Sequence, residues 1–179
     1  MKRPLFPPGS LRTVGTIIVL LMIASCRRDA LGIPPDSSYV IDKYLVSRIG
    51  ATSQGGTVFC DFEPLTPMIQ SGSGYDVYLW VLCQEYFIHD ARLQEGMGLS
   101  LPIALTLEWR GSGYVVQEGR IPGEVAQSEE LVREYFPRAA WAEIEPQSDQ
   151  EVEGYNARVE RLQTRVEGLA IARFFDPGK

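Results

Sequence analysis

The chain of 179 residues has 17 lysine and arginine residues against 23 aspartate and glutamate residues, so its net charge at neutral pH is −6. An acidic chain lacks the basic surface that nucleic-acid phosphates require, and we expect no nucleic-acid partner. The sequence has no G-x-S-x-G elbow, no phosphate-binding glycine loop and no H-E-x-x-H motif, so we predict neither a cofactor nor a metal.

The first 25 residues have the parts of a secretory signal. Lys2, Arg3 and Arg12 are the only charges in this segment and make its start positive. The apolar run at residues 14–24 is too short to cross a bilayer as a helix, which takes roughly 20 residues. It has the length of a signal-peptide core, and the small residues Ala24 and Ser25 follow as a cleavage site requires.

The "IASC" sequence that ends at Cys26 resembles the lipobox of bacterial lipoproteins, in which an aliphatic residue and two small residues precede a cysteine. The resemblance implies that Cys26 becomes the first mature residue and carries a diacylglyceryl thioether, often with a further acyl chain. Two or more chains anchor a protein stably. A plain cleaved signal with a coincidental cysteine and an uncleaved anchor are the alternatives. We therefore predict a protein that is lipid-anchored at the extracytoplasmic face of the cell membrane.

Removal of residues 1–25 would leave 154 residues, of which 14 are basic and 23 acidic. Such an acidic body is repelled by an anionic membrane surface, so the lipid has to provide the anchoring. Residues 26–37 are polar and contain prolines, and we predict that they form a tether. The remaining length suits one domain with its own core, predicted at residues 38–175.

A helix is predicted at the start of the domain. Tyr39, Val40, Tyr44 and Leu45 follow helical spacing, and Gly50 is a plausible C-terminal cap.

Two strands are predicted next, at residues 55–65 and 75–87, because both segments are rich in β-branched and aromatic residues and the segment between them is rich in turn formers. A hairpin about Ser71 and Gly72 places Cys60 opposite Cys83. Directly opposed residues approach to about 4.5 Å between Cα atoms, near the short end of the disulfide range. An extracytoplasmic compartment permits such a bridge, and two free, buried thiols are the alternative.

A third strand is predicted at residues 98–109, where apolar and polar side chains alternate, and Pro102 is expected at the beginning of the strand or at a bulge. The "RGSG" turn and a return strand at residues 114–121 follow.

Helices are predicted for the rest of the chain. A short helix begins at Ser128 as its cap and stops before Pro137. Ser148 and Glu151 form a capping box for the last helix, whose apolar residues alternate at spacings of three and four over too few heptads for a coiled coil. We predict an α+β fold, a curved antiparallel sheet of four to five strands with the N-terminal helix and the C-terminal helices on one face.

The segments "VFCDFEPL", "VYLWVLCQEYF", "EGMGLSLPIALTLE" and "GYVVQEGRIPGE" resemble a poorly characterised family of bacterial extracytoplasmic domains. Such domains occur in single lipoproteins and after membrane metallopeptidases of the antibiotic-sensor type. The resemblance implies a cystatin-like or NTF2-like sheet-and-helix domain and little about activity.

One face of the predicted hairpin combines carboxylates with aromatic side chains. Residues two apart share a face, so Asp61 and Glu63 lie with Tyr78, Trp80 and Tyr86. Such a set can bind a small polar or cationic ligand. The alternatives are the solvated face of an ordinary sheet and burial beneath the last helix.

His89 is the only histidine and is expected in a surface loop beside Asp90. We favour a non-catalytic domain that binds an envelope protein or a small ligand. The alternative is a small NTF2-like enzyme that uses Asp61 or Glu63 as its acid or base.

Overall fold

The computed structural model describes residues 32–33, 35–122 and 129–176. The predicted signal at residues 1–25, the lipidation residue Cys26 and the predicted cap Ser128 lie outside the described residues. In chain order the elements are α2 (Pro35–Arg48), β1 (Thr57–Pro64), β2 (Ile69–Ser71), β3 (Gly74–His89), β4 (Arg92–Arg110), β5 (Gly113–Arg120), α3 (Glu129–Tyr135), α4 (Arg138–Ile144) and α5 (Asp149–Phe175).

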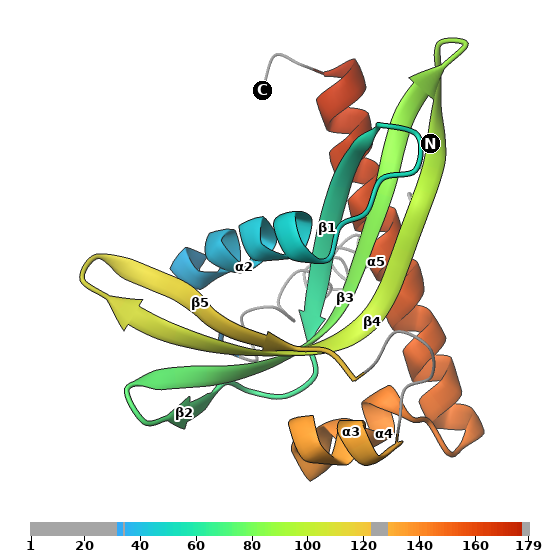
Figure 1. Ribbon diagram of the computed structural model, residues 1–179. Helices are drawn as coiled ribbons and strands as arrows, with labels where there is room; N and C mark the ends of the chain where they lie inside the picture. The colour runs from blue at the N-terminus through green and yellow to red at the C-terminus, as the bar shows by residue number, and fades with distance from the viewer. Residues whose placement is uncertain (1–31, 34, 123–128, 177–179) are drawn as a thin grey trace, which may run out of the picture.

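The strands form one antiparallel sheet in the order β1-β3-β4-β5, and β2 also pairs with β3. β3 and β4 are long and strongly curved, and Figure 1 shows them running from the hairpin tip at the top, past β1, into a part that points away from α5. We call this part, where β2 and β5 pair with β3 and β4, the wing. The prediction of an α+β fold with an antiparallel sheet of about five strands is confirmed.

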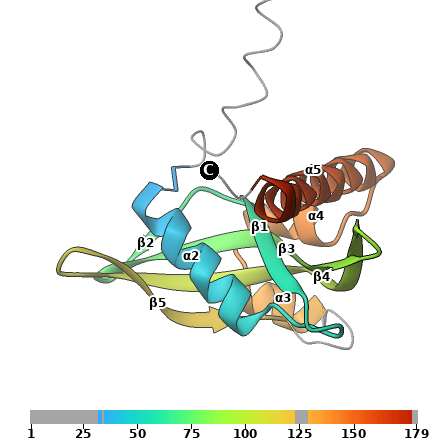
Figure 2. The ribbon, with the colours of Figure 1, turned by 90° about the horizontal axis from the view of Figure 1, so that it is seen from above.

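The helices cover both faces of the sheet, so the prediction that they share one face is wrong (Figure 2). Ile41 and Leu45 of α2 pack against the face that carries Leu79 and Leu105. Helices α3, α4 and α5 pack against the opposite face, which carries Trp80. The reason is that side chains alternate along β3, and apolar residues occupy both sets of positions, so each face has to be covered.

The buried side of helix α2 overlaps the predicted pattern in part. Leu45 is buried as predicted, together with Ser37 and Ile41, whereas Tyr39 is 62% exposed. The helix begins at Pro35, so the last residues of the predicted tether already belong to it. The helix ends as expected, because the Gly50 N–H donates to the Leu45 carbonyl oxygen over 2.9 Å.

Helix α5 begins with the predicted capping box of Ser148 and Glu151. Its buried residues are four apart, at Arg158, Leu162, Val166 and Ala170, which is the stripe of a helix that packs on a sheet. None of the described helices combines the length and apolar composition needed to span a membrane.

The short helix α4 was not predicted from the sequence. Pro137 immediately precedes this helix, and Ala140 and Ile144 are its buried residues. A helix of seven residues has too few turns to show a clear period.

Strand β4 is longer than predicted, and Pro102 lies inside it opposite Trp80. The expectation that Pro102 marks the start of the strand or a bulge is therefore wrong. The pairing of β5 with β4 stops at Ala104, so Pro102 occupies a stretch of β4 that has one strand neighbour in the described chain. Proline has no backbone N–H to donate, and it is tolerated in a stretch of strand whose second edge pairs with no other strand.

Candidate functional site

The carboxylates Asp61 and Glu63 lie on the face of β1 that α5 covers, and α5 meets them with arginines. Arg158, Arg161 and Arg165 are three and four residues apart, a spacing that puts them on one side of a helix. Their guanidinium groups form ion pairs with both carboxylates, which are nearly one hundred residues away in sequence. We call these five residues the arginine–carboxylate cluster.

Glu63 is the centre of the cluster. Arg161 donates from Nε to Glu63 Oε1 over 3.0 Å and from Nη2 to Oε2 over 2.7 Å, a bidentate pair. Arg165 donates from Nη1 to Glu63 Oε1 over 3.0 Å and from Nε to Asp61. The carboxylate oxygens thus face guanidinium groups rather than an open site.

Arg158 connects the cluster to α4. Its side chain lies 3.8 Å from Glu63 Oε2 through Nε and also bonds the carboxylate of Glu143. It donates to the Glu143 carbonyl oxygen as well, over 3.3 Å. Counting Glu143, three cations stand against three carboxylates, so the cluster joins β1, α4 and α5 without net charge.

The charges of Glu63 and Arg161 are fixed at neutral pH. Burial alone would raise the pKa of Glu63, but the hydrogen bonds from Arg161 and Arg165 outweigh it and lower the pKa below its usual value. The same contact with Glu63 raises the pKa of Arg161. A general acid has to hold a proton near the working pH, and Glu63 is ionised there. The ion pairs of the arginine–carboxylate cluster hold α5 against β1.

The aromatic residues of the predicted face are packed beneath the helices. Trp80 is 1% and Tyr86 3% exposed, and Tyr78 is half-buried. The Trp80 ring meets Tyr155 of α5 edge to face at 5.0 Å, and its Nε1 donates to Ser100 Oγ over 2.9 Å. Of the interpretations left open by the sequence, burial beneath the last helix is therefore the one the structure supports.

The phenols of this face are also shielded from solvent. Burial, followed by Glu95 and Glu167, raises the pKa of Tyr86 to about 12. Tyr78 packs against Phe136 with ring centroids 5.8 Å apart, and burial, followed by Asp76, raises its pKa. Both hydroxyl groups stay protonated at neutral pH.

The predicted disulfide between Cys60 and Cys83 is present. The two residues are direct partners in the β1–β3 ladder, with Cα atoms 4.1 Å apart. The bridge lies on the α2 face, opposite the arginine–carboxylate cluster.

Glu85, a fully buried carboxylate on the α2 face, was not predicted from the sequence. Its oxygens accept hydrogen bonds from the backbone N–H groups of Ser53, Gln54, Gly56 and Met97 at distances from 2.7 to 3.3 Å. Burial alone would raise the pKa of Glu85, but these bonds lower it to about 2. The carboxylate thus fastens the loop between α2 and β1 to the sheet.

Gly96 is the neighbour that makes room for this carboxylate. A Cβ atom on Gly96 would lie 2.2 Å from Glu85 Oε2. A glycine in the middle of a strand marks a close approach of this kind, and it was the available signal for the Glu85 site.

His89 lies at the tip of the β3–β4 hairpin, where Asp90 and Ala91 form the turn with φ angles of 50° and 58°. The His89 and Asp90 side chains are 3.5 Å apart and are 64% and 87% exposed. Within the described residues, no group of three histidine, cysteine or acidic side chains is placed to hold a metal ion.

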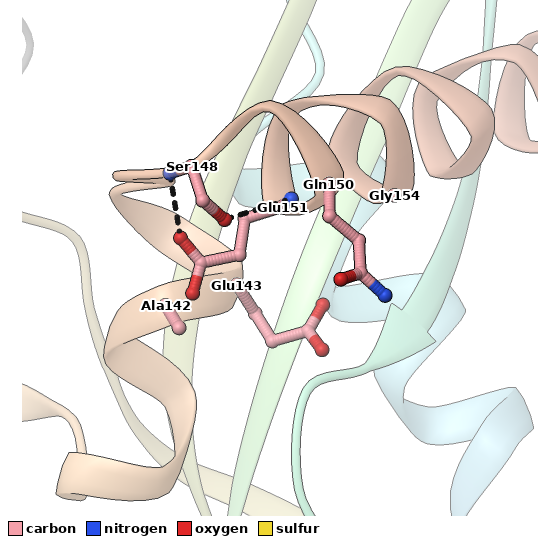
Figure 3. Close-up of a pocket in the computed structure, with 6 residues that line it drawn as sticks. All are labelled: Ala142, Glu143, Ser148, Gln150, Glu151 and Gly154. Carbon is pink, nitrogen blue, oxygen red and sulfur yellow. Dashed lines mark hydrogen bonds between the residues drawn. The ribbon is translucent and has the colours of Figure 1, made fainter.

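Three shallow hollows on the surface are lined by residues outside the predicted face. One of about 380 Å³ lies where α4 meets the capping box of α5 (Figure 3) and is lined by Ala142, Glu143, Ser148, Gln150, Glu151 and Gly154. A second, of about 450 Å³, adjoins it at Ala142, and a third, of about 390 Å³, lies beside Arg161 and Arg165. Asp61, Glu63, Tyr78, Trp80 and Tyr86 line none of these three.

No protein-family model matches the chain, and no curated protein or solved structure matches it at a significant level.

Proposed function

We propose that this chain is a lipid-anchored protein of the extracytoplasmic face of the cell membrane, with a domain that binds an envelope protein or a small ligand and catalyses no reaction. The observation that carries the proposal is the Cys60–Cys83 disulfide. Disulfides persist in oxidising compartments outside the cytoplasm. The same chain has the positive start, the short apolar run and the "IASC" ending of a lipoprotein signal.

The arginine–carboxylate cluster argues against the enzymatic alternative, in which Asp61 or Glu63 acts as the acid or base. Asp61 and Glu63 are engaged by Arg161 and Arg165, and Trp80 is packed against Tyr155. An acid or base needs access to its substrate and a pKa near the working pH.

We also propose that the domain is of the cystatin-like or NTF2-like type. The support is the long helix α5, which packs across a curved antiparallel sheet after an N-terminal helix and a series of strands.

The mass of the intact protein extracted gently from bacterial membranes tests the anchoring proposal. We expect the mass of residues 26–179 plus acyl chains, less two hydrogens for the disulfide. Cys26→Ser is the control and should leave an unacylated chain. A full-length mass, or an unacylated mass for the unmodified protein, would overturn the proposed anchoring.

A further inference from the structure

The wing has one aromatic face. Tyr75, Trp109 and Tyr114 lie on its α2 side, with the Tyr75 and Tyr114 ring centroids 6.0 Å apart and those of Trp109 and Tyr114 5.0 Å apart. Tyr75 and Tyr114 pack against the α2-side core, whereas Trp109 is 49% exposed. Trp109 thus presents a half-exposed aromatic ring beside two tyrosines that pack on the core.

The opposite face of the wing carries polar side-chain pairs and the 43% exposed side chain of Ile69. Thr106 donates to Asp76 across β3 and β4 over 3.0 Å, and Arg110 pairs with Glu108 at 2.7 Å. The aromatic face is the one suited to an apolar or interfacial partner.

The chain enters the domain on the aromatic side. Ile33, two residues before α2, packs against the same cluster as Tyr75 and Tyr114. Figures 1 and 2 both show the start of α2 on the side of the molecule to which the wing extends. Near this start, Tyr39 is 62% exposed and Lys43 Nζ lies 4.6 Å from its ring centroid.

We propose that the aromatic side of the wing rests on the lipid bilayer, with the rings of Trp109 and Tyr39 at the level of the lipid headgroups. Tryptophan and tyrosine favour this level because each ring combines an apolar body with a polar group. The inference rests on the proposed lipid anchor at Cys26.

The length of the tether supports this orientation. From Cys26 to Pro35 there are nine residues, which span roughly 30 Å at most when fully extended. Helix α5 has 27 residues and is therefore about 40 Å long. A tether shorter than the molecule keeps the end where α2 begins close to the bilayer, and this is the end at which the wing presents its aromatic face.

Tryptophan quenching tests the orientation, because the three tryptophans of the chain lie in different places. Trp80 is 1% exposed in the core, Trp141 is half-buried on α4 at the opposite face, and Trp109 is on the wing. The full lipidated protein is reconstituted into vesicles of phosphatidylethanolamine and phosphatidylglycerol with or without bromine on the acyl chains. Trp109→Phe and the matched control Trp141→Phe are measured beside the unmodified protein.

We expect brominated lipids to quench the emission of the unmodified protein and of Trp141→Phe, and to leave that of Trp109→Phe unquenched. Equal quenching in all three proteins, quenching lost in Trp141→Phe, or no quenching at all in vesicle-bound protein would overturn the orientation while leaving the anchor intact. Flotation of the vesicles separates the two proposals, because a protein that does not float with them lacks the anchor, and both proposals then fail.

Discussion

The two faces of the sheet both bury carboxylates, but they neutralise them differently. On the α2 face, Glu85 accepts hydrogen bonds from backbone N–H groups of a loop and of β4. On the α5 face, Asp61 and Glu63 meet arginine side chains of a helix. Backbone donors are fixed by the fold and carry no long side chains that have to be ordered, whereas half-exposed arginines lose part of their interaction to water. The α2 face therefore holds its charge more rigidly.

Replacing Trp80 tests whether the α5 face of the sheet forms part of the hydrophobic core. Trp80→Ala should lower the free energy of unfolding by about 3–5 kcal/mol, the usual cost of removing a large buried aromatic ring. Urea unfolding measures this. Trp109→Ala, at an exposed position of the same sheet, should change stability far less, and equal effects of the two changes would contradict the assignment of Trp80 to the core.

Loss of the Cys60–Cys83 disulfide on the α2 face should also destabilise the protein. Replacing both Cys60 and Cys83 by alanine should cost about 3 kcal/mol, since the bridge closes a loop across a sequence separation of 23. Thermal unfolding with and without a reducing agent measures it. The reducing agent should destabilise the unmodified protein and leave the double variant unchanged; an effect on both would show that the bridge is not its target.

The buried carboxylate of Glu85 should make the stability of the folded protein depend on pH. Its pKa is about 2 in the folded protein and 4.5 as the ordinary value, so the folded state binds fewer protons between these limits. Its stabilising contribution is complete above about pH 4.5 and is lost as the pH falls toward 2. Urea midpoints of the unmodified protein and of Glu85→Gln, measured over this range, should converge as the pH falls. A constant difference between them would contradict the lowered pKa.

The smallest effect is expected at the arginine–carboxylate cluster. The Arg161 and Arg165 side chains are 39% and 37% exposed, so solvent screens their pairing with Glu63. After that discount, Glu63→Gln should cost about 1 kcal/mol. A double-mutant cycle with Arg161→Gln isolates the pair, and its coupling energy should shrink in high salt. A coupling unaffected by salt would mean that the pair is more deeply buried than its exposure indicates.

The sequence was most informative where the pattern was local. The pairing of Cys60 with Cys83 and the shared face of Glu63 and Trp80 were predicted correctly, although the turn lies one residue further along. The ladder beyond the turn pairs Ser71 with Gly74, and extra residues between β1 and β2 restore the predicted register. The register derived from a turn at Ser71 and Gly72 was thus correct because the extra residues compensate for the shifted turn.

Features that depend on distant partners were harder to predict. The arginines of α5 read as the polar side of an amphipathic helix, and only the docked helix brings Arg165 to Asp61. Glu85 faces the same side of β3 as Cys83, as simple alternation predicts, but its backbone donors at Ser53 and Gly56 lie about thirty residues away in sequence. The assignment of all helices to one face failed for a related reason, because alternation shows that a face is apolar but not which helix covers it.

The free stretch of β4 bears on how copies of this domain meet one another. From Arg92 to Ile103, β4 has no strand on its outer side within the described residues. An uncovered edge is a template on which neighbouring chains can assemble into fibrils. Here Pro102 removes one donor from the stretch, and the register shift near Gly96 breaks its straight course. Along this stretch of β4, adjacent copies can therefore form only a short run of backbone hydrogen bonds.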